Sequence, residues 1–177
     1  EMRRIAKMVR PDITVITTIG HSHLECLGDL EGVLRAKAEV FEYMSSEGLA
    51  VLSGDDALLS TYDPGVRVCT FGTGENCDFR AEAIRQSMNG AESSIEFSVL
   101  HGNERFDARV DAFGTHLVSA ALAAAAVGRA LNVTNDAIAR GLLDYAPVGR
   151  RANVSSTGYI TLIDDCYNAN PNSMRAS

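Results

Sequence analysis

Two histidines and one lysine are the residues of this chain whose type and position suggest catalysis or metal binding. His21 and His23 come directly after residues 13–19, a run rich in β-branched side chains that predicts a buried strand. In an open α/β sheet, ligands bind beyond the carboxyl ends of the strands. The two imidazoles are therefore expected where such a fold places its site, and Lys37 follows on the next predicted helix.

The helix expected after these histidines carries Lys37 on its apolar side. Asp29 is the expected N-cap, and the helix is expected to run to about Ser46. A lysine on a buried face needs a partner or a changed charge state, whereas a lysine at the edge of the face keeps its ammonium in water. Both interpretations stay open on the sequence alone. At about 100° per residue, the apolar side chains form one stripe with the lysine in its middle: Leu30, Val33, Leu34, Val40, Phe41 and Met44.

In their order along the chain, these motifs resemble the central domain of the Mur ligase family. The matching strings are Ile-Gly-x-x-His-Leu-Glu, Gly-x-Leu-Glu-Gly-Val and Ala-Lys-x-Glu-x-Phe. In that family the histidine of His-Leu-Glu binds a magnesium ion, and the lysine of Ala-Lys-x-Glu carries CO2 as a carbamate that helps to bind the metal. The resemblance implies catalytic and metal-binding roles for His23 and Lys37. The amphipathic pattern alone does not imply the carbamate.

A second match lies near the C-terminus, after a predicted strand over residues 159–163. The string Asp-Asp-Cys-Tyr-Asn-Ala-Asn-Pro resembles the family motif Asp-Asp-Ser-Tyr-Asn-Ala-Asn-Pro, with Cys166 in place of the serine. The resemblance implies nucleotide binding by Asp165, Tyr167 and Asn168. A turn rich in Asp and Asn residues would explain the same string without a function.

Two further matches concern single residues. The family has Gly-Arg-Met before this strand, with an arginine that reaches the nucleotide. The string here is Gly-Arg-Arg-Ala, so either Arg150 or Arg151 takes that role, or both are solvated linker arginines. His116 begins a string similar to the family's His-Asn-x-x-Asn-Ala-Leu, in which Leu117 and Ala120 replace the asparagines. The resemblance makes His116 a nucleotide-binding candidate, with a structural role at the start of a helix as the alternative.

The order of the predicted elements indicates an α/β fold with a mostly parallel sheet and flanking helices, extended by an antiparallel β-meander. Asn-Gly between two extended runs is the hairpin signal within the meander. The expected strands are residues 13–19, 49–53, 66–71, 79–88, 93–100, 104–110 and 159–163, and the expected helices are one before Pro11, the helix with Lys37, a short one opening at Gly54, and residues 113–131 and 134–143.

The resemblance also divides the chain into domains. It implies that residues 1–148 are the C-terminal part of the central ATP-binding domain and that residues 149–177 start a Rossmann-like C-terminal domain. We expect a truncated piece of a longer protein, because both ends interrupt a predicted helix. The only lysines, Lys7 and Lys37, each follow an alanine, so the sequence contains no Gly-Lys-Ser/Thr phosphate loop. The 177 residues alone are therefore expected to be inactive.

Composition narrows the possible partners and the location. The net charge of −7 argues against nucleic acid as a partner, and no apolar run is long enough to span a bilayer. The four cysteines are scattered, which indicates free thiols in a reducing cytoplasm. We expect a monomer.

The function that the resemblance implies is ATP-dependent ligation in peptidoglycan precursor synthesis, and therefore a role in cell wall biogenesis, cell shape and cell division. The residues are most similar to the branch that joins D-alanyl-D-alanine to UDP-N-acetylmuramoyl-tripeptide through an acyl phosphate, with ATP and Mg2+ as cofactors. One alternative is a non-catalytic binding module of the same fold. Another is a metal-dependent amidohydrolase, which also uses His-x-His after a strand and a carbamylated lysine but needs a full barrel and further histidines.

Overall fold

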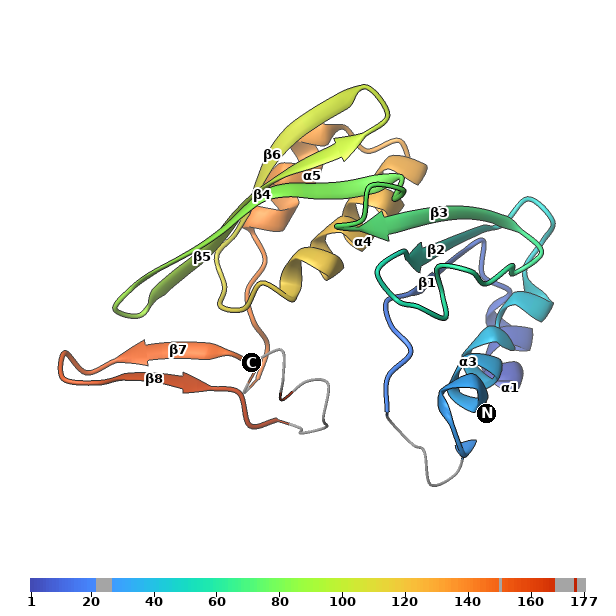
Figure 1. The fold of residues 1–177 in the computed structure, drawn as a ribbon, viewed down its shortest axis with the longest axis horizontal. Coiled ribbons are helices and arrows are strands. Elements are labelled where there is room, and N and C mark those ends of the chain that lie inside the picture. The colour runs from blue at the N-terminus through green and yellow to red at the C-terminus, as the bar shows by residue number, and fades with distance from the viewer. Residues whose placement is uncertain (22–26, 150, 168–173, 175–177) are drawn as a thin grey trace. The chain divides into compact units, whose positions relative to one another are not determined.

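The computed structural model describes residues 1–21, 27–149, 151–167 and 174. The chain forms two compact units, Glu1–Arg80 and Ala81–Ser177. Strands β1 to β6 follow one another in sequence order in one sheet, and β7 and β8 form a separate two-stranded sheet (Figure 1). The expected α/β fold, with a mostly parallel sheet, flanking helices and an antiparallel extension, is confirmed.

The first unit is built on parallel strands. β1 (Ile13–Ile16) pairs with β2 (Leu49–Ser53), and β2 pairs with β3 (Arg67–Gly72), both in parallel. β3 also pairs in parallel with the start of β4 (Phe79–Asn89). Every residue of β2 is buried, as expected for a parallel strand with both faces covered. The predicted strands at β2 and β3 are confirmed, whereas β1 is shorter than the run over residues 13–19 suggested.

Helices α1 (Met2–Val9) and α3 (Leu30–Ala38) belong to the same unit. The apolar stripe predicted around Lys37 packs against the core, because most of its members are buried or partly buried there. A single cluster of buried apolar side chains therefore joins the helix to the strands. The cluster consists of Ile16, Ile19, Val33, Phe41, Ala50, Leu52 and Leu59.

Helix α3 starts as predicted and ends early. The Asp29 carboxylate caps it by accepting a hydrogen bond from the Gly32 amide at 2.7 Å. The helix was expected to reach Ser46, but the chain tightens into a 3-10 turn, η1 (Phe41–Tyr43). The backbone amides in this stretch donate to carbonyls three residues back, as in 3-10 geometry. This tighter winding places Phe41 in the core, where it is 7% exposed.

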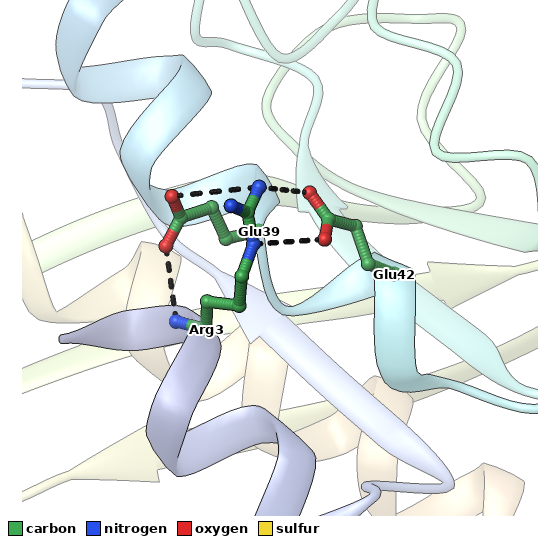
Figure 2. A network of polar contacts seen from close by, with 3 residues as sticks. All are labelled: Arg3, Glu39 and Glu42. Carbon is green, nitrogen blue, oxygen red and sulfur yellow. Dashed lines mark hydrogen bonds and ion pairs between the residues drawn. The ribbon is translucent and has the colours of Figure 1, made fainter.

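An exposed polar network joins α1 to the chain after α3 (Figure 2). The Arg3 guanidinium donates to both carboxylate oxygens of Glu42, at 2.7 and 3.0 Å. The Arg3 backbone amide donates to Glu39 at 3.0 Å. Ion pairs as exposed as this one are screened by water and contribute little to stability. The network therefore orients α1 more than it stabilises the unit.

The second unit contains the rest of the meander and two helices. β5 (Glu92–His101) and β6 (Glu104–Val110) pair in antiparallel fashion, which confirms the predicted meander strands. α4 (Leu117–Ala130) contacts β5, and α5 (Asn135–Leu143) contacts β6 and α4. The buried residues of α4 are alanine, valine and leucine, as its apolar composition predicted. None of the helices that the structure describes combines the length and apolar character needed to cross a membrane.

The last two strands form a hairpin. β8 (Thr161–Asp164) corresponds to the strand predicted near the C-terminus, and it pairs in antiparallel fashion with β7 (Asn153–Ser156), which the sequence did not predict. Large apolar side chains of this hairpin are exposed: Tyr159 is 98% and Leu162 57% accessible. A two-stranded sheet alone is marginally stable in water.

Candidate functional site

Asp56, just after β2, holds the loop that leaves β1. Its Oδ2 atom accepts hydrogen bonds from the Ile19 amide at 2.7 Å and from Thr18 Oγ1 at 3.1 Å. Its Oδ1 atom accepts from the amides of Leu58 and Leu59 at 3.1 and 3.2 Å. One carboxylate therefore fixes both the end of the β1 segment and the turn that follows β2.

Two sequence predictions are wrong at this place. The strand expected over residues 13–19 stops at Ile16, because the Ile19 amide bonds to the Asp56 side chain instead of to a neighbouring strand. The helix expected to open at Gly54 is a series of turns. The Asp56 side chain accepts hydrogen bonds from the amides two and three residues on, as an N-cap does, and the Ser60 amide bonds to the Asp56 carbonyl, but the chain does not continue as a helix.

Lys37 reaches the same loop from α3. Its Nζ atom donates a hydrogen bond to the Thr18 carbonyl oxygen at 2.7 Å, and the residue is half-buried. Desolvation lowers the pKa of Lys37, and the negative charge of Asp56 partly offsets that effect. Among the described residues, no carboxylate lies within ion-pair distance of this amine. The geometry fits a partly desolvated lysine better than one whose ammonium extends into water.

Asp55 holds the loop that follows β3, on the other side of β2, as Asp56 holds the loop that follows β1. Its carboxylate accepts hydrogen bonds from the Thr73 amide at 2.8 and 3.0 Å, from Thr73 Oγ1 at 3.2 Å and from the Gly74 amide at 3.1 Å. A Cβ atom at Gly72 would lie 2.5 to 2.8 Å from atoms of this carboxylate, so a larger residue would push the Asp55 side chain out of its place. Asp55 thus ties the end of β3 to the end of β2.

Three of the predicted nucleotide-binding residues come together beside the β7–β8 hairpin. The guanidinium carbon of Arg151 lies 4.5 Å from the centroid of the Tyr167 ring, in cation–π contact. The Oδ1 atom of Asp165 accepts a hydrogen bond from the Ala152 amide at 3.1 Å. The segment before β7 and the segment after β8 therefore meet through the residues that the family motif singled out.

His116 lies directly before α4. Its ring packs over Gly114, where a Cβ atom would be 2.4 Å from the nearest ring atom. Gly114 has a φ of +107°, in the region that favours glycine, and this bend makes α4 begin at Leu117 instead of residue 113. The contact gives His116 a structural role, and its nucleotide-binding role stays a prediction.

The remaining candidates are outside the described part of the chain. They are His23, Arg150 and Asn168. His21 is described and is exposed. Lys37 belongs to the first unit and the group around Tyr167 to the second, and each has its own local geometry.

Residues 1–128 match the family described as the Mur ligase middle domain. The chain belongs to the Mur ligase family. The resemblance predicted from the motifs is confirmed, and the amidohydrolase alternative is wrong.

Curated relatives and solved structures agree with this assignment. The UDP-N-acetylmuramoyl-tripeptide–D-alanyl-D-alanine ligase of Bacillus subtilis is 32% identical to the Mur ligase chain over 179 residues, covering 100% of the chain and 37% of that protein. The UDP-N-acetylmuramate–L-alanine ligase of Desulforamulus reducens is 31% identical over 175 residues, covering 96% of the chain and 37% of that protein. A crystal structure of MurF from Acinetobacter baumannii has a TM-score of 0.89 at 30% identity, over 99% of the chain and 38% of that structure. The Mur ligase chain thus spans well under half the length of these relatives.

The described residues of this Mur ligase chain do not form a metal centre by themselves. They contain no group of three or more His, Cys, Asp and Glu side chains that could hold an ion. The Asp56 carboxylate already accepts hydrogen bonds from amide and hydroxyl groups, and the Lys37 amine acts as a hydrogen-bond donor. The predicted metal ligands are Lys37, whose amine has no oxygen ligand, and His23, which is outside the described residues, so their metal-binding roles stay predictions.

Sequence reasoning missed Asp55, Asp56 and Thr18 in the Mur ligase chain. The available signal was a pair of adjacent aspartates after a buried strand. The same signal drew attention to Asp164 and Asp165 near the C-terminus, where a family motif supported it.

Proposed function

We propose that this chain is part of an ATP-dependent ligase that joins D-alanyl-D-alanine to UDP-N-acetylmuramoyl-tripeptide. ATP phosphorylates the terminal carboxylate of the tripeptide, which gives an acyl phosphate and ADP. The amine of D-alanyl-D-alanine then attacks the carbonyl carbon, and phosphate leaves. Membership of the Mur ligase family supports the ligase class, and the 32% identity to the Bacillus subtilis ligase supports this substrate pair.

The environment of Lys37 is the observation that carries the proposal. Its amine is half-buried beside the carboxyl end of β1, and desolvation lowers its pKa. A lowered pKa increases the fraction of neutral amine, and the neutral amine is the form that takes up CO2 to become a carbamate. The hydrogen bond to the Thr18 carbonyl holds this amine at the loop that follows β1.

His23 and the carbamate on Lys37 would hold magnesium. Mg2+ is bound mainly by oxygen ligands, and a carbamate supplies two of them where the amine supplies none. When bound, the ion neutralises the negative charge that gathers on the transferring phosphoryl group. The contribution of this chain is to hold the lysine at the end of β1, close in sequence to His23.

A second group of residues would bind the nucleotide. A carboxylate can accept hydrogen bonds from ribose hydroxyls, and a guanidinium suits ribose or phosphate. In this proposal residues 1–148 belong to the central ATP-binding domain and residues 149–177 begin the C-terminal domain. The nucleotide-binding residues would be Asp165, Arg151 or Arg150, Tyr167, Asn168 and His116.

We also infer the cellular setting from the proposed reaction. Peptidoglycan precursors that carry UDP are made in the cytoplasm, so the ligase would be a cytoplasmic monomer. Its activity would serve cell wall biogenesis and through it cell shape and cell division. The net charge of −7 gives no support to a nucleic-acid partner.

The test is a product assay with the intact ligase, ATP and Mg2+. Addition of UDP-N-acetylmuramoyl-tripeptide and D-alanyl-D-alanine should release phosphate and form the UDP-linked pentapeptide. UDP-N-acetylmuramate with L-alanine should give no product, although a ligase for that pair is 31% identical to this chain. Binding of ATP without phosphate release under either condition would favour a non-catalytic binding module. The 177 residues alone should release no phosphate, because they lack a phosphate loop.

A further inference from the structure

We propose that Asp56 is a positioning residue that fixes the Lys37 amine through the peptide group of Thr18. The inference rests on the proposed function, in which Lys37 carries a carbamate. No hydrogen bond or ion pair joins Asp56 to Lys37 directly: the Asp56 carboxylate bonds to the β1 loop, and the β1 loop bonds to the amine.

Asp56 sets the direction of the Thr18 carbonyl. Its Oδ2 atom accepts from Thr18 Oγ1 and from the Ile19 amide. The Thr18 carbonyl and the Ile19 amide belong to one planar, trans peptide group, in which C=O and N–H point in opposite directions. Holding the N–H toward Asp56 therefore turns the carbonyl oxygen away from Asp56 and toward Lys37. This arrangement explains why the two charged side chains influence each other electrostatically without forming an ion pair.

The Thr18 carbonyl in turn orients the amine. A neutral amine has two N–H bonds and one lone pair, and Lys37 uses one N–H in its 2.7 Å bond to the carbonyl. A carbonyl oxygen accepts hydrogen bonds only, so it leaves the lone pair available. The reactive lone pair is thus directed away from the β1 loop.

The same hydrogen bond can persist in the carbamate. In carbamate formation, the Nζ lone pair makes a bond to the carbon of CO2, one C–O π pair moves onto oxygen, and one N–H proton leaves to solvent. The product keeps a single N–H. If that N–H stays on the Thr18 carbonyl, it fixes the plane of the carbamate and the direction of both oxygens. Asp56 would thus set the orientation of a metal-binding group that it does not touch.

Asp55 provides a matched control within the same turn. Its carboxylate also takes up backbone amides and a threonine hydroxyl, but these belong to Thr73 and Gly74 on the side of β3. Loss of either aspartate removes a similar set of hydrogen bonds. Only the loss of Asp56 releases the peptide that holds Lys37. The two variants should therefore lose similar stability and differ at Lys37.

The experiment compares Asp56→Ala and Asp55→Ala in the intact ligase, using labelled bicarbonate and steady-state kinetics. In Asp56→Ala we expect the carbamate carbon signal to fall about tenfold, because a hydrogen bond to a charged group is lost. We expect kcat to fall by about ten- to a hundredfold through misplacement of the amine. The KM for ATP should stay within about twofold, since the proposed nucleotide residues lie elsewhere in the chain. Asp55→Ala should keep both the signal and kcat.

A gentler variant keeps the inference testable if Asp56→Ala does not fold. Thr18→Val removes only the hydroxyl bond to Asp56 and keeps the Ile19 amide bond. We expect a decrease of about threefold in the carbamate signal, corresponding to a weak neutral-donor bond. Thr18→Ser should restore the signal, because serine also carries a hydroxyl.

The possible outcomes separate the inference from the proposed function. An unchanged carbamate signal in Asp56→Ala overturns the inference, and so does an equal loss in both aspartate variants, which would assign the effect to stability. A wild-type ligase without any carbamate signal, or a Lys37→Ala ligase of normal activity, overturns the proposed role of Lys37 instead.

Discussion

β2 and β8 carry the same local sequence feature in opposite surroundings. Each is a short apolar strand with two adjacent aspartates at its carboxyl end, Asp55 and Asp56 after β2, and Asp164 and Asp165 at β8. Every residue of β2 is buried, whereas Leu162 in β8 is 57% exposed. The aspartates after β2 hold neighbouring strands, and Asp165 accepts a hydrogen bond from the segment that leads into β7.

Burial of the strand decides what its aspartates do. Next to a buried strand, the neighbouring chain supplies amides that need acceptors, so a carboxylate there becomes a fixed part of the structure. At the end of the β7–β8 hairpin, Asp165 is half-buried and accepts a bond from the Ala152 amide, beside strands whose apolar side chains are exposed. We therefore expect changes in β2 to act mainly on stability and changes at the end of β8 to act mainly on ligand binding.

Lys37 is expected to be the strongest exception to this rule, because its substitution should affect activity and not stability. It lies beside the buried strand ends, yet we expect Lys37→Ala and Lys37→Arg to reduce ligation at least about a thousandfold, since each removes the carbamate that positions the metal. The fold should survive, because alanine and arginine are good helix formers. Ligation rate and melting temperature would be measured together. A fully active Lys37→Arg ligase would reduce Lys37 to an ordinary cation.

The strands themselves give the direct stability test. Leu52→Ala should cost about 2–5 kcal/mol in the free energy of unfolding, because Leu52 is completely buried in the first unit. Leu162→Ala, the matched substitution in β8, should stay within about 0.5 kcal/mol. Urea unfolding of both variants measures the difference. Equal losses would show that β8 is buried in solution and that the comparison between the strands fails.

Two free thiols, in β3 and after β8, allow the same comparison without a change in the core. Burial raises the pKa of Cys69 to about 11, whereas Cys166 is exposed. At pH 8 an alkylating reagent should label Cys69 about a hundredfold more slowly than a thiol with the ordinary pKa of 9.0. Mass spectrometry of the labelled chain would measure both rates, and similar rates for the two thiols would contradict the prediction.

The shifted pKa of Cys69 also predicts how stability depends on pH. Its folded pKa of about 11 lies above the unfolded value of 9.0, so the neutral thiol favours the folded state below pH 9. That contribution should be lost as the pH rises from about 9 to 11. Cys69→Ala should reduce the slope of the free energy of unfolding in this window.

The smallest expected effect is at Asp165. Asp165→Ala should raise the KM for ATP by about tenfold, the low end for a lost hydrogen bond to a charged group. The melting temperature should change little. Asp55→Ala is the control from the end of β2, with a lower melting temperature, because it loses bonds to Thr73 and Gly74, and an unchanged KM. A large melting shift in Asp165→Ala with normal ATP kinetics would make Asp165 a structural residue as well.

The parts of the fold that the sequence predicts are those fixed by local signals. Apolar runs predicted β2 and β3, and the Asn-Gly turn predicted the hairpin between β4 and β5. The strand β7 was missed because its residues, Asn-Val-Ser-Ser, have little apolar character and its pairing depends on β8, further along the chain. The end of α3 was misplaced because burial of Phe41 favours a 3-10 turn over a longer helix.

The candidate site shows the same limit. Lys37 was singled out because its neighbours on one helix reveal its position in the apolar stripe. Asp56 was not, because its partner Thr18 is 38 residues away and only the folded sheet brings them together. A pair of aspartates is a local pattern with several meanings, and the contacts that select among them are not local.

The close approach of Gly72 to Asp55 couples the residues that evolution can accept at these two positions. A methyl group there would collide with the carboxylate of Asp55, while Asp55 needs that closeness to reach Thr73 and Gly74. Neither residue can be replaced first without a penalty, so Gly72→Ala should be tolerated far better when Asp55 is already small. In homologous chains, substitutions at positions 55 and 72 should therefore occur together. Aspartate at position 55 combined with alanine at position 72 should be rare.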